Sequence, residues 1–423
     1  MRFAERVAEV RGGFERAFWV ANISELFERL SYYAAFASLA RYLHETLSFP
    51  LERAADLSGL FGGLVWFLAI FGGAIADRLG FRRALSLAYL ILAGSYFLLG
   101  SLGAAWLEPV RAAVPLAALV TVVLMLPALG VALVKPSVVA TTARASNENV
   151  RSIGYSIYYT LVNIGGFFGP LVASWVHKNL SVENVFRVAA VGVFVMFFAV
   201  LLFFQEPQKS GEVATENLGV TMRNFRKVLA SPKFMIFLLI FSGYWIVYWQ
   251  IWVTLPIYVH DYVDGKADTE RMLSTGPLIV IAFTVVFSVL TKKMLAFRAV
   301  VLGTFVAMTG FAILAAHRSM VAVYATLVVI AVGELIQSPR YYDYISRLAP
   351  AGQQGTYMGF AFLPLGIGAF ASGRIGGALL HHFGEMQHRP EMFLWALTAI
   401  GMVTTVALWI YDRVVKPSES RAA

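Results

Sequence analysis

Long apolar stretches recur along the whole chain, and each is long enough to cross a lipid bilayer. A transmembrane helix needs about 20 apolar residues, and 59% of the 423 residues are apolar while 14% are charged. Soluble domains carry roughly 25% charged residues, so a soluble globule of this length is excluded. We therefore expect an all-α membrane protein with twelve transmembrane helices, at 17–43, 56–76, 84–103, 112–141, 152–175, 186–205, 234–260, 272–291, 298–316, 319–347, 355–380 and 392–412.

The longest polar segment, residues 206–233, divides these spans into two sets of six. We predict an N-terminal six-helix bundle at 1–205, a cytoplasmic linker at 206–233 and a C-terminal six-helix bundle at 234–423. Most Lys and Arg residues between the spans fall on the side of the N-terminus. Because cytoplasmic loops carry the excess of basic residues, we expect both termini to be cytoplasmic.

The charge and cysteine counts restrict the function further. The formal net charge of +9 is explained by basic cytoplasmic loops beside anionic lipid, so we expect a lipid bilayer and no nucleic acid as partner. The chain has no Cys, which excludes thiol catalysis and thiolate metal sites. No catalytic, phosphate-binding or metal-ligand pattern is present, so we expect neither an enzyme nor a cofactor.

The loop after the second span contains glycines, one aspartate and three arginines. Residues 72–83 are GGAIADRLGFRR, which is similar to the span 2–3 signature of major facilitator transporters, G-x-x-A-D-R-x-G-R-R in outline. Two six-span halves joined by a linker are also the plan of these transporters. We interpret Asp77, Arg78, Arg82 and Arg83 as parts of an inner gate. An ordinary basic loop that sets topology is the alternative.

Several ionisable residues lie inside expected spans, where they are costly and usually line a functional cavity. Glu25, Glu28, Arg29, Tyr32 and Tyr33 have helical spacing that places them on one face of the first span. Two acids that compete for shared cations are suited to proton coupling, because protonating one acid releases its cation. Structural ion pairs between helices are the alternative.

The fourth and tenth spans supply further charges. Lys135 lies in the fourth span, and Glu334 lies about halfway along the tenth. Arg340 and Asp343 follow toward the inner end, where we assign them to the gate. For these two residues and for Arg374 in the eleventh span, a structural ion pair is a serious alternative.

Four segments in both halves of the chain resemble the signatures of the proton-dependent oligopeptide transporter (POT) family of the major facilitator superfamily. Residues 25–33, ELFERLSYY, are similar to the family's E-x-x-E-R-F-x-Y-Y, with Leu30 in place of Phe. Residues 134–137, VKPS, are similar to its fourth-span K-P motif, and residues 156–166, SIYYTLVNIGG, to its fifth-span F-Y-x-x-I-N-I-G pattern. Residues 333–350, GELIQSPRYYDYISRLAP, resemble its tenth-span segment G-E-L-x-x-S-P…E…L-A-P.

The resemblance implies roles for the matching positions. Glu25 and Glu28 would bind protons and exchange ion pairs with Lys135, while Arg29 would meet a substrate carboxylate. Glu334 would meet a substrate amine. The candidate substrate-binding residues are Arg29, Tyr32, Tyr33, Lys135, Asn163, Trp245, Trp249, Gln250 and Glu334.

The seventh span departs from the family pattern. The family has an acid four residues after its Trp, whereas this chain has Trp249 four residues after Trp245. One protonatable group is therefore missing. Trp245, Tyr248 and Trp249 are read equally well as an aromatic cavity wall and as plain packing.

We hypothesise a proton-coupled symporter that imports di- and tripeptides or similar small zwitterions by alternating access, driven by the proton gradient. It would work as a monomer in a bacterial inner membrane. The alternative is a proton-antiporting exporter of lipophilic cations or metabolites on the same fold. A non-transporting sensor is a third hypothesis, which the short tail from Asp412 to Ala423 disfavours.

Overall fold

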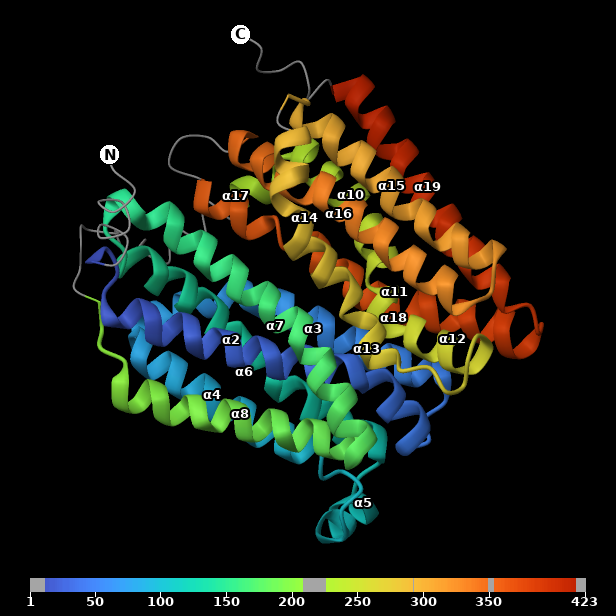
Figure 1. Ribbon diagram of the computed structural model, residues 1–423, viewed down its shortest axis with the longest axis horizontal. Helices are drawn as coiled ribbons and strands as arrows, with labels where there is room; N and C mark the ends of the chain where they lie inside the picture. The colour runs from blue at the N-terminus through green and yellow to red at the C-terminus, as the bar shows by residue number, and fades with distance from the viewer. Residues whose placement is uncertain (1–11, 208–225, 292, 349–353, 416–423) are drawn as a thin grey trace. The chain divides into compact units, whose positions relative to one another are not determined.

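The computed structural model of the protein describes residues 12–207, 226–291, 293–348 and 354–415. Among these residues every named element is helical, as the sequence predicts (Figure 1). Contacts within the chain define two compact units. Unit 1 comprises residues 1–38 and 67–215, and unit 2 comprises residues 39–66 and 216–423.

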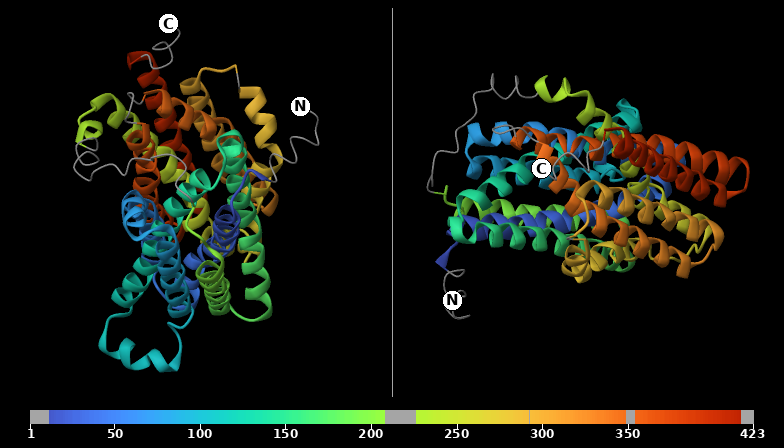
Figure 2. Two further views of the ribbon diagram at one scale, coloured as in Figure 1. Left: turned by 90° about the vertical axis from the view of Figure 1, so that its left-hand side faces the viewer. Right: turned by 90° about the horizontal axis from the view of Figure 1, so that it is seen from above.

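Six long helices account for most of the chain before residue 204. They are α2 (Arg16–Arg41), α3 (Leu51–Leu79), α4 (Phe81–Leu99), α6 (Leu116–Arg144), α7 (Arg151–Asn179) and α8 (Val182–Phe203). Short elements lie between them, namely η1 (Tyr42–Thr46), η2 (Ala105–Leu107), α5 (Glu108–Ala113) and η3 (Glu148–Val150). Figure 2 shows the connection with α5 projecting beyond the ends of α4 and α6, which it joins.

The helices after residue 231 are more often interrupted. They are α10 (Pro232–Tyr248), α11 (Gln250–Val253), α12 (Leu255–Tyr262), α13 (Thr269–Leu273), α14 (Thr275–Thr291), α15 (Ala296–Ala316), α16 (Met320–Leu348), α17 (Gln354–Phe360), α18 (Leu363–Leu380), η4 (His381–Met386) and α19 (Pro390–Val415). Residues 208–225 of the expected linker lie outside the described residues.

Ten helices in the described part of the chain are long and apolar enough to cross a membrane. Each of them corresponds to one of the expected spans. The first two expected spans, 17–43 and 56–76, coincide with α2 and α3, and their membrane crossing stays a prediction. In its described residues the protein is therefore an all-helical membrane protein.

Three expected spans are interrupted rather than continuous. The seventh consists of α10, α11 and α12, the eighth of α13 and α14, and the eleventh of α17 and α18. Prolines explain two of these breaks, because Pro256 and Pro364 occupy the first turn of α12 and of α18. Proline has no N–H group to continue a helix but is tolerated in its first turn.

In unit 1, α4 packs against α6 and α8, and α7 packs against the same two helices. Figure 1 shows α4 and α8 side by side. Gly130 of α6 faces Leu92 of α4 so closely that a Cβ atom would lie 2.5 Å from Leu92 Cγ. Small residues at such points let helix backbones approach in a membrane.

In unit 2, the segment 39–66, which contains the start of α3, packs against α18. A Cβ atom at Gly59 would lie 2.7 Å from the Ala369 carbonyl oxygen and 2.8 Å from the Gly373 nitrogen. A Cβ atom at Gly377 would lie 3.0 Å from Ala55 Cβ. The two helices therefore meet backbone to backbone, which requires glycine on both sides.

A ladder of aromatic contacts joins α10 to α16 in the core of unit 2. Phe241 stacks on Tyr341 with ring centroids 4.5 Å apart, and Phe237 meets Tyr344 edge-on at 5.1 Å. The Tyr341 hydroxyl donates to the Ala361 carbonyl at 2.7 Å. The ladder ends where α10 and α16 bring Tyr248 to Glu334.

Candidate functional site

Unit 1 buries a group of charges on α2. Glu25 and Glu28 are 0% exposed and Arg29 is 3% exposed. Arg29 Nε donates to Glu28 Oε2 and lies 3.5 Å from Glu25 Oε1. One guanidinium nitrogen therefore serves two carboxylates, of which helical spacing predicts the contact with Glu25. The Arg29 guanidinium also lies over the ring of Tyr32, 4.8 Å from its centroid.

Lys135 of α6 supplies the second cation. It is half-buried and interacts electrostatically with Glu25, Glu28 and Arg29, so two acids and two cations form one group. Both oxygens of Glu25 accept no hydrogen bond from the described residues. A buried charge needs compensation, and the two cations provide it for the two carboxylates.

Two glycines of α7 place α2 for this arrangement. A Cβ atom at Gly165 would lie 2.5 Å from Arg29 Cβ, and one at Gly169 would lie 2.9 Å from Tyr33 Cβ. The two glycines are four residues apart and so lie on one face of α7. The helix bearing the charges can therefore approach the backbone of α7 closely.

Three tyrosines near the charges are absent from the sequence-based site. Tyr89 and Tyr96 of α4 are fully buried, and the Tyr96 hydroxyl has no hydrogen-bond partner among the described residues. Both lie within electrostatic range of Glu28, as does Tyr158 of α7. Tyr89 and Tyr96 are seven residues apart, which is the helical signal that could have identified them.

Other predicted residues of unit 1 occupy different settings. Tyr32 is buried at 3% exposure, and its ring meets that of Tyr33 edge-on at 5.2 Å. Asn163 is half-buried and donates from Nδ2 to the Tyr159 carbonyl of its own helix at 2.8 Å. A role for Asn163 in substrate binding stays a prediction.

Unit 2 holds a second acidic position. The Tyr248 hydroxyl, at the end of α10, donates to Glu334 Oε2 of α16 at 2.9 Å. Within this unit, no described basic residue forms an ion pair with Glu334. Trp245 and Tyr248 meet edge-on with centroids 5.0 Å apart, so an aromatic wall adjoins the carboxylate. A carboxylate in this setting can accept a hydrogen bond from an ammonium group.

Trp249 and Gln250 both make hydrogen bonds to α18. Trp249 Nε1 donates to the Leu365 carbonyl at 3.1 Å, and Gln250 Nε2 donates to the Ser372 carbonyl at 3.0 Å. Both side chains are buried. These contacts tie the interrupted seventh span to the eleventh.

The predicted gate residues after the second span lie around the start of α4. Arg78, Arg82 and Arg83 are exposed, whereas the side chain of Asp77 lies outside the described residues. Gly80 has φ of +79°, a conformation that favours glycine. The Arg82 backbone N–H donates to Glu206 Oε1 at 2.8 Å. The sequence-based boundary places Glu206 in the linker and does not predict its contact with α4.

The predicted gate residues of α16 pair with one another. Arg340 Nη1 lies 3.5 Å from Asp343 Oδ2, and Arg347 Nε lies 2.7 Å from Asp343 Oδ1. Arg340 also donates to the Thr291 carbonyl at the end of α14. Arg374 of α18 is exposed.

The end of α2 carries another ion-pair group, which we call the Arg41 cluster (Arg41, Glu45, His260, Asp261, Thr269 and Glu270). The Arg41 guanidinium binds both oxygens of Glu45, at 2.6 and 2.9 Å. It also donates to Thr269 Oγ1 at 3.0 Å and lies 3.8 Å from Glu270 Oε2. Bidentate contacts between arginine and a carboxylate are among the stronger ion pairs in proteins.

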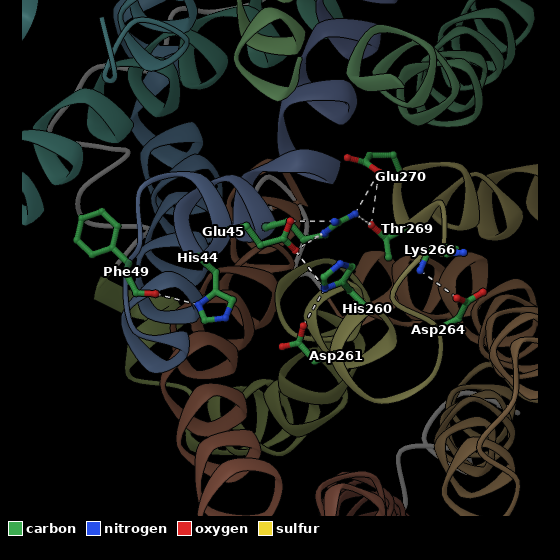
Figure 3. A network of polar contacts seen from close by, with 10 residues as sticks. His44, Glu45, Phe49, His260, Asp261, Asp264, Lys266, Thr269 and Glu270 are labelled. Carbon is green, nitrogen blue, oxygen red and sulfur yellow. Dashed lines mark hydrogen bonds and ion pairs between the residues drawn. The ribbon is translucent and has the colours of Figure 1, made fainter. Parts of the chain in front are cut away.

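His260 of α12 completes the Arg41 cluster. Its Nδ1 lies 2.8 Å from Asp261 Oδ1 and 3.5 Å from Glu45 Oε1 (Figure 3). The cluster lies within unit 2 and joins η1 to α12 and α13. No local sequence pattern indicates this cluster, because its members are up to 229 residues apart.

The fold and the buried charges define an integral membrane protein with polar sites inside helical units. A sequence profile of the Major Facilitator Superfamily matches residues 21–373. The chain therefore belongs to the Major Facilitator Superfamily, which makes it a transporter rather than an enzyme.

Individual relatives and solved structures share 25% or less of their sequence with this chain. The chain is 25% identical to the multidrug resistance protein MdtH of Salmonella paratyphi B (strain ATCC BAA-1250 / SPB7) over 362 residues, 84% of this chain and 85% of that protein. A POT family transporter in complex with a thioalcohol conjugated peptide matches with a TM-score of 0.79 at 20% identity, covering 96% and 97% of the two chains. Another, in complex with 5-aminolevulinic acid, matches with a TM-score of 0.78 at 18% identity, covering 94% and 96%. The fold is thus that of POT transporters, as the sequence motifs predict.

Proposed function

We propose that the protein is a proton-coupled symporter that imports di- and tripeptides or similar small zwitterions by alternating access. The observation that carries this proposal is the group in unit 1 of two buried carboxylates with the buried Arg29 and the half-buried Lys135. Protonation of Glu25 or Glu28 would leave Arg29 or Lys135 free to bind a substrate carboxylate. The proton gradient is then the energy source, and no cofactor is needed.

The substrate would be bound at both of its charged ends. Arg29 and Lys135 would bind the carboxylate, and Glu334 would bind the amine. The remaining candidate substrate residues are Tyr32, Tyr33, Asn163, Trp245, Trp249 and Gln250. The ligands named for two structural neighbours, 5-aminolevulinic acid and a conjugated peptide, motivate the range of substrates that we propose.

The proposed arrangement in the membrane follows the sequence. Twelve spans form bundles at 1–205 and 234–423, with both termini cytoplasmic in a bacterial inner membrane. We propose a functional monomer that needs no partner besides substrate and lipid. Arg340 and Asp343 would belong to the inner gate, together with Asp77, Arg78, Arg82 and Arg83.

Uptake by purified protein in proteoliposomes tests the proposal. An inward proton gradient should drive accumulation of a labelled di- or tripeptide, and a protonophore should abolish it. Empty liposomes are the control. If no di- or tripeptide is taken up in a gradient-dependent manner, the peptide form of the proposal is wrong.

A second candidate function is proton-antiporting export of lipophilic cations or metabolites. The aromatic contacts of Trp245, Tyr248 and Trp249 beside Glu334 favour it, because aromatic faces attract organic cations. The 25% identity to a multidrug resistance protein also motivates it. A thermal-shift screen separates the two candidates: stabilisation by hydrophobic cations but not by peptides would favour export.

A further inference from the structure

The junction between α10 and α11 is fixed to α18 at two points. Trp249 occupies the junction, since α10 ends at Tyr248 and α11 begins at Gln250. The acceptors on α18 are the carbonyls of Leu365 and Ser372. They are seven residues apart, which is about two helical turns or roughly 10 Å. Two contacts at that separation fix both the position and the direction of the junction.

The Gln250 side chain is held by neighbours on its own segment and on α18. Besides Ser372, Gln250 Nε2 donates to the Ile246 carbonyl at 3.0 Å, and Oε1 accepts from Thr254 Oγ1 at 2.6 Å. Both ends of the amide are therefore in use. A Cβ atom at Gly376 would collide with this amide, so α18 accommodates Gln250 only because residue 376 is glycine.

Tyr248 directly precedes this junction. Its ring meets Trp249 edge-on at 6.4 Å, and its hydroxyl donates to Glu334 Oε2 at 2.9 Å. The path from α18 through Trp249 and Tyr248 to Glu334 is thus continuous. Glu334 Oε1 accepts no hydrogen bond from the described residues of unit 2, which leaves that oxygen for a ligand.

We propose that Trp249 is a positioning residue: its indole N–H holds the junction on α18 so that Tyr248 orients the Glu334 carboxylate toward a substrate ammonium group. Trp249 therefore acts on substrate binding through Tyr248 and not through a proton of its own. The inference rests on the proposed function in one respect only, the assignment of Glu334 to the substrate amine.

The test is a double-mutant cycle with Trp249→Phe and Tyr248→Phe in proteoliposomes. Trp249→Phe keeps an aromatic ring and removes the donor, so we expect KM for a dipeptide to rise about fivefold, the effect of one hydrogen bond, with little change in maximal rate. In the Tyr248→Phe background, Trp249→Phe should raise KM no further. Additive effects on KM would overturn the proposal.

Two controls keep the result interpretable. Trp395→Phe makes the same change at an exposed position of α19 and should leave KM unchanged. If the wild-type protein transports no zwitterion, the proposed function fails, and the cycle is then read from melting temperatures of the ligand-free variants. Non-additive melting shifts support the positioning role, and additive shifts overturn it independently of the substrate.

Discussion

At the scale of single residues, Arg29 makes the two acids of the first span unequal. It donates a hydrogen bond to Glu28, whereas Glu25 lies 3.5 Å away and has both oxygens without a hydrogen-bond partner among the described residues. Neutralising either acid would weaken its hold on the guanidinium. Removing one partner of a buried ion pair costs about 3–5 kcal/mol because the other charge is left uncompensated. Glutamine also removes the charge, but it keeps the packing and a hydrogen-bond acceptor, so the charge is the main property that changes.

We predict that Glu28→Gln abolishes proton-driven uptake and spares counterflow exchange of substrate. Glutamine keeps the shape of the side chain but binds no proton, so the gradient can no longer act through the acid that holds Arg29, while exchange needs no net proton movement. Both activities are measured in the same proteoliposomes. Glu15→Gln, at an exposed position before α2, should retain both. Loss of exchange in Glu28→Gln would instead indicate a structural or binding role.

The acids and Arg29 could be predicted because their spacing places them on one helical face. Tyr89 and Tyr96 could not be assigned with the same force, because a phenol in an apolar span serves packing as readily as function. The partners of Arg41 were out of reach for another reason: Thr269 and Glu270 lie 228 and 229 residues away. Local pattern carries no information on contacts at that separation.

At the scale of elements, hydropathy predicted the positions and order of the helices, but it did not predict the interruptions within three of the expected spans. The segments around Trp249 and Phe362 are as apolar as the unbroken spans, so periodicity predicts one continuous helix in each case. Tertiary hydrogen bonds from Trp249 and Gln250 to α18 accompany the first break. Pro256 and Pro364 were the local signals that could have suggested interruptions.

The contact of α2 with α7 depends on glycine, and we predict that Gly165→Ala destabilises the protein by about 1–3 kcal/mol. The new methyl group would lie 2.5 Å from Arg29 Cβ and 3.1 Å from Leu30 N, so the helices must separate. Thermal unfolding in detergent measures the effect. Gly94→Ala in α4 is the matched control, because no atom lies within 4 Å of its Cβ position; there alanine should stabilise by about 0.5–1 kcal/mol. Equal melting shifts in the two variants would contradict the close contact.

At the scale of the whole molecule, the segment 39–66 groups with helices that are far from it in the sequence. It is part of the chain that runs from α2 into α3, yet it is compact with unit 2 through the Arg41 cluster and the glycine contacts with α18. Alternating access requires large elements to change partners. The division at residues 206–233 stays a prediction. The grouping of 39–66 could not be predicted from hydropathy, because hydropathy does not say which helices pack against one another.

We predict that a disulfide between Ala55→Cys and Gly377→Cys reversibly stops transport. The two Cβ positions are 3.0 Å apart, and because a disulfide needs about 3.5–4.5 Å, the two helices must part slightly to accommodate it. The natural chain has no Cys to interfere. Oxidant should inhibit uptake and reductant should restore it. Each single variant under oxidant is the control. Full transport by the cross-linked protein would mean that 39–66 stays with α18 throughout the cycle.

Glu206 has a practical consequence for work on this transporter. Because this side chain accepts a hydrogen bond from the first turn of α4, the chain that leaves α8 is anchored before it continues toward α10. A fusion partner for imaging is therefore best inserted beyond Pro207, where the anchor is left intact. An insertion before Glu206 would separate this connection from α4, and the images would then show a perturbed protein.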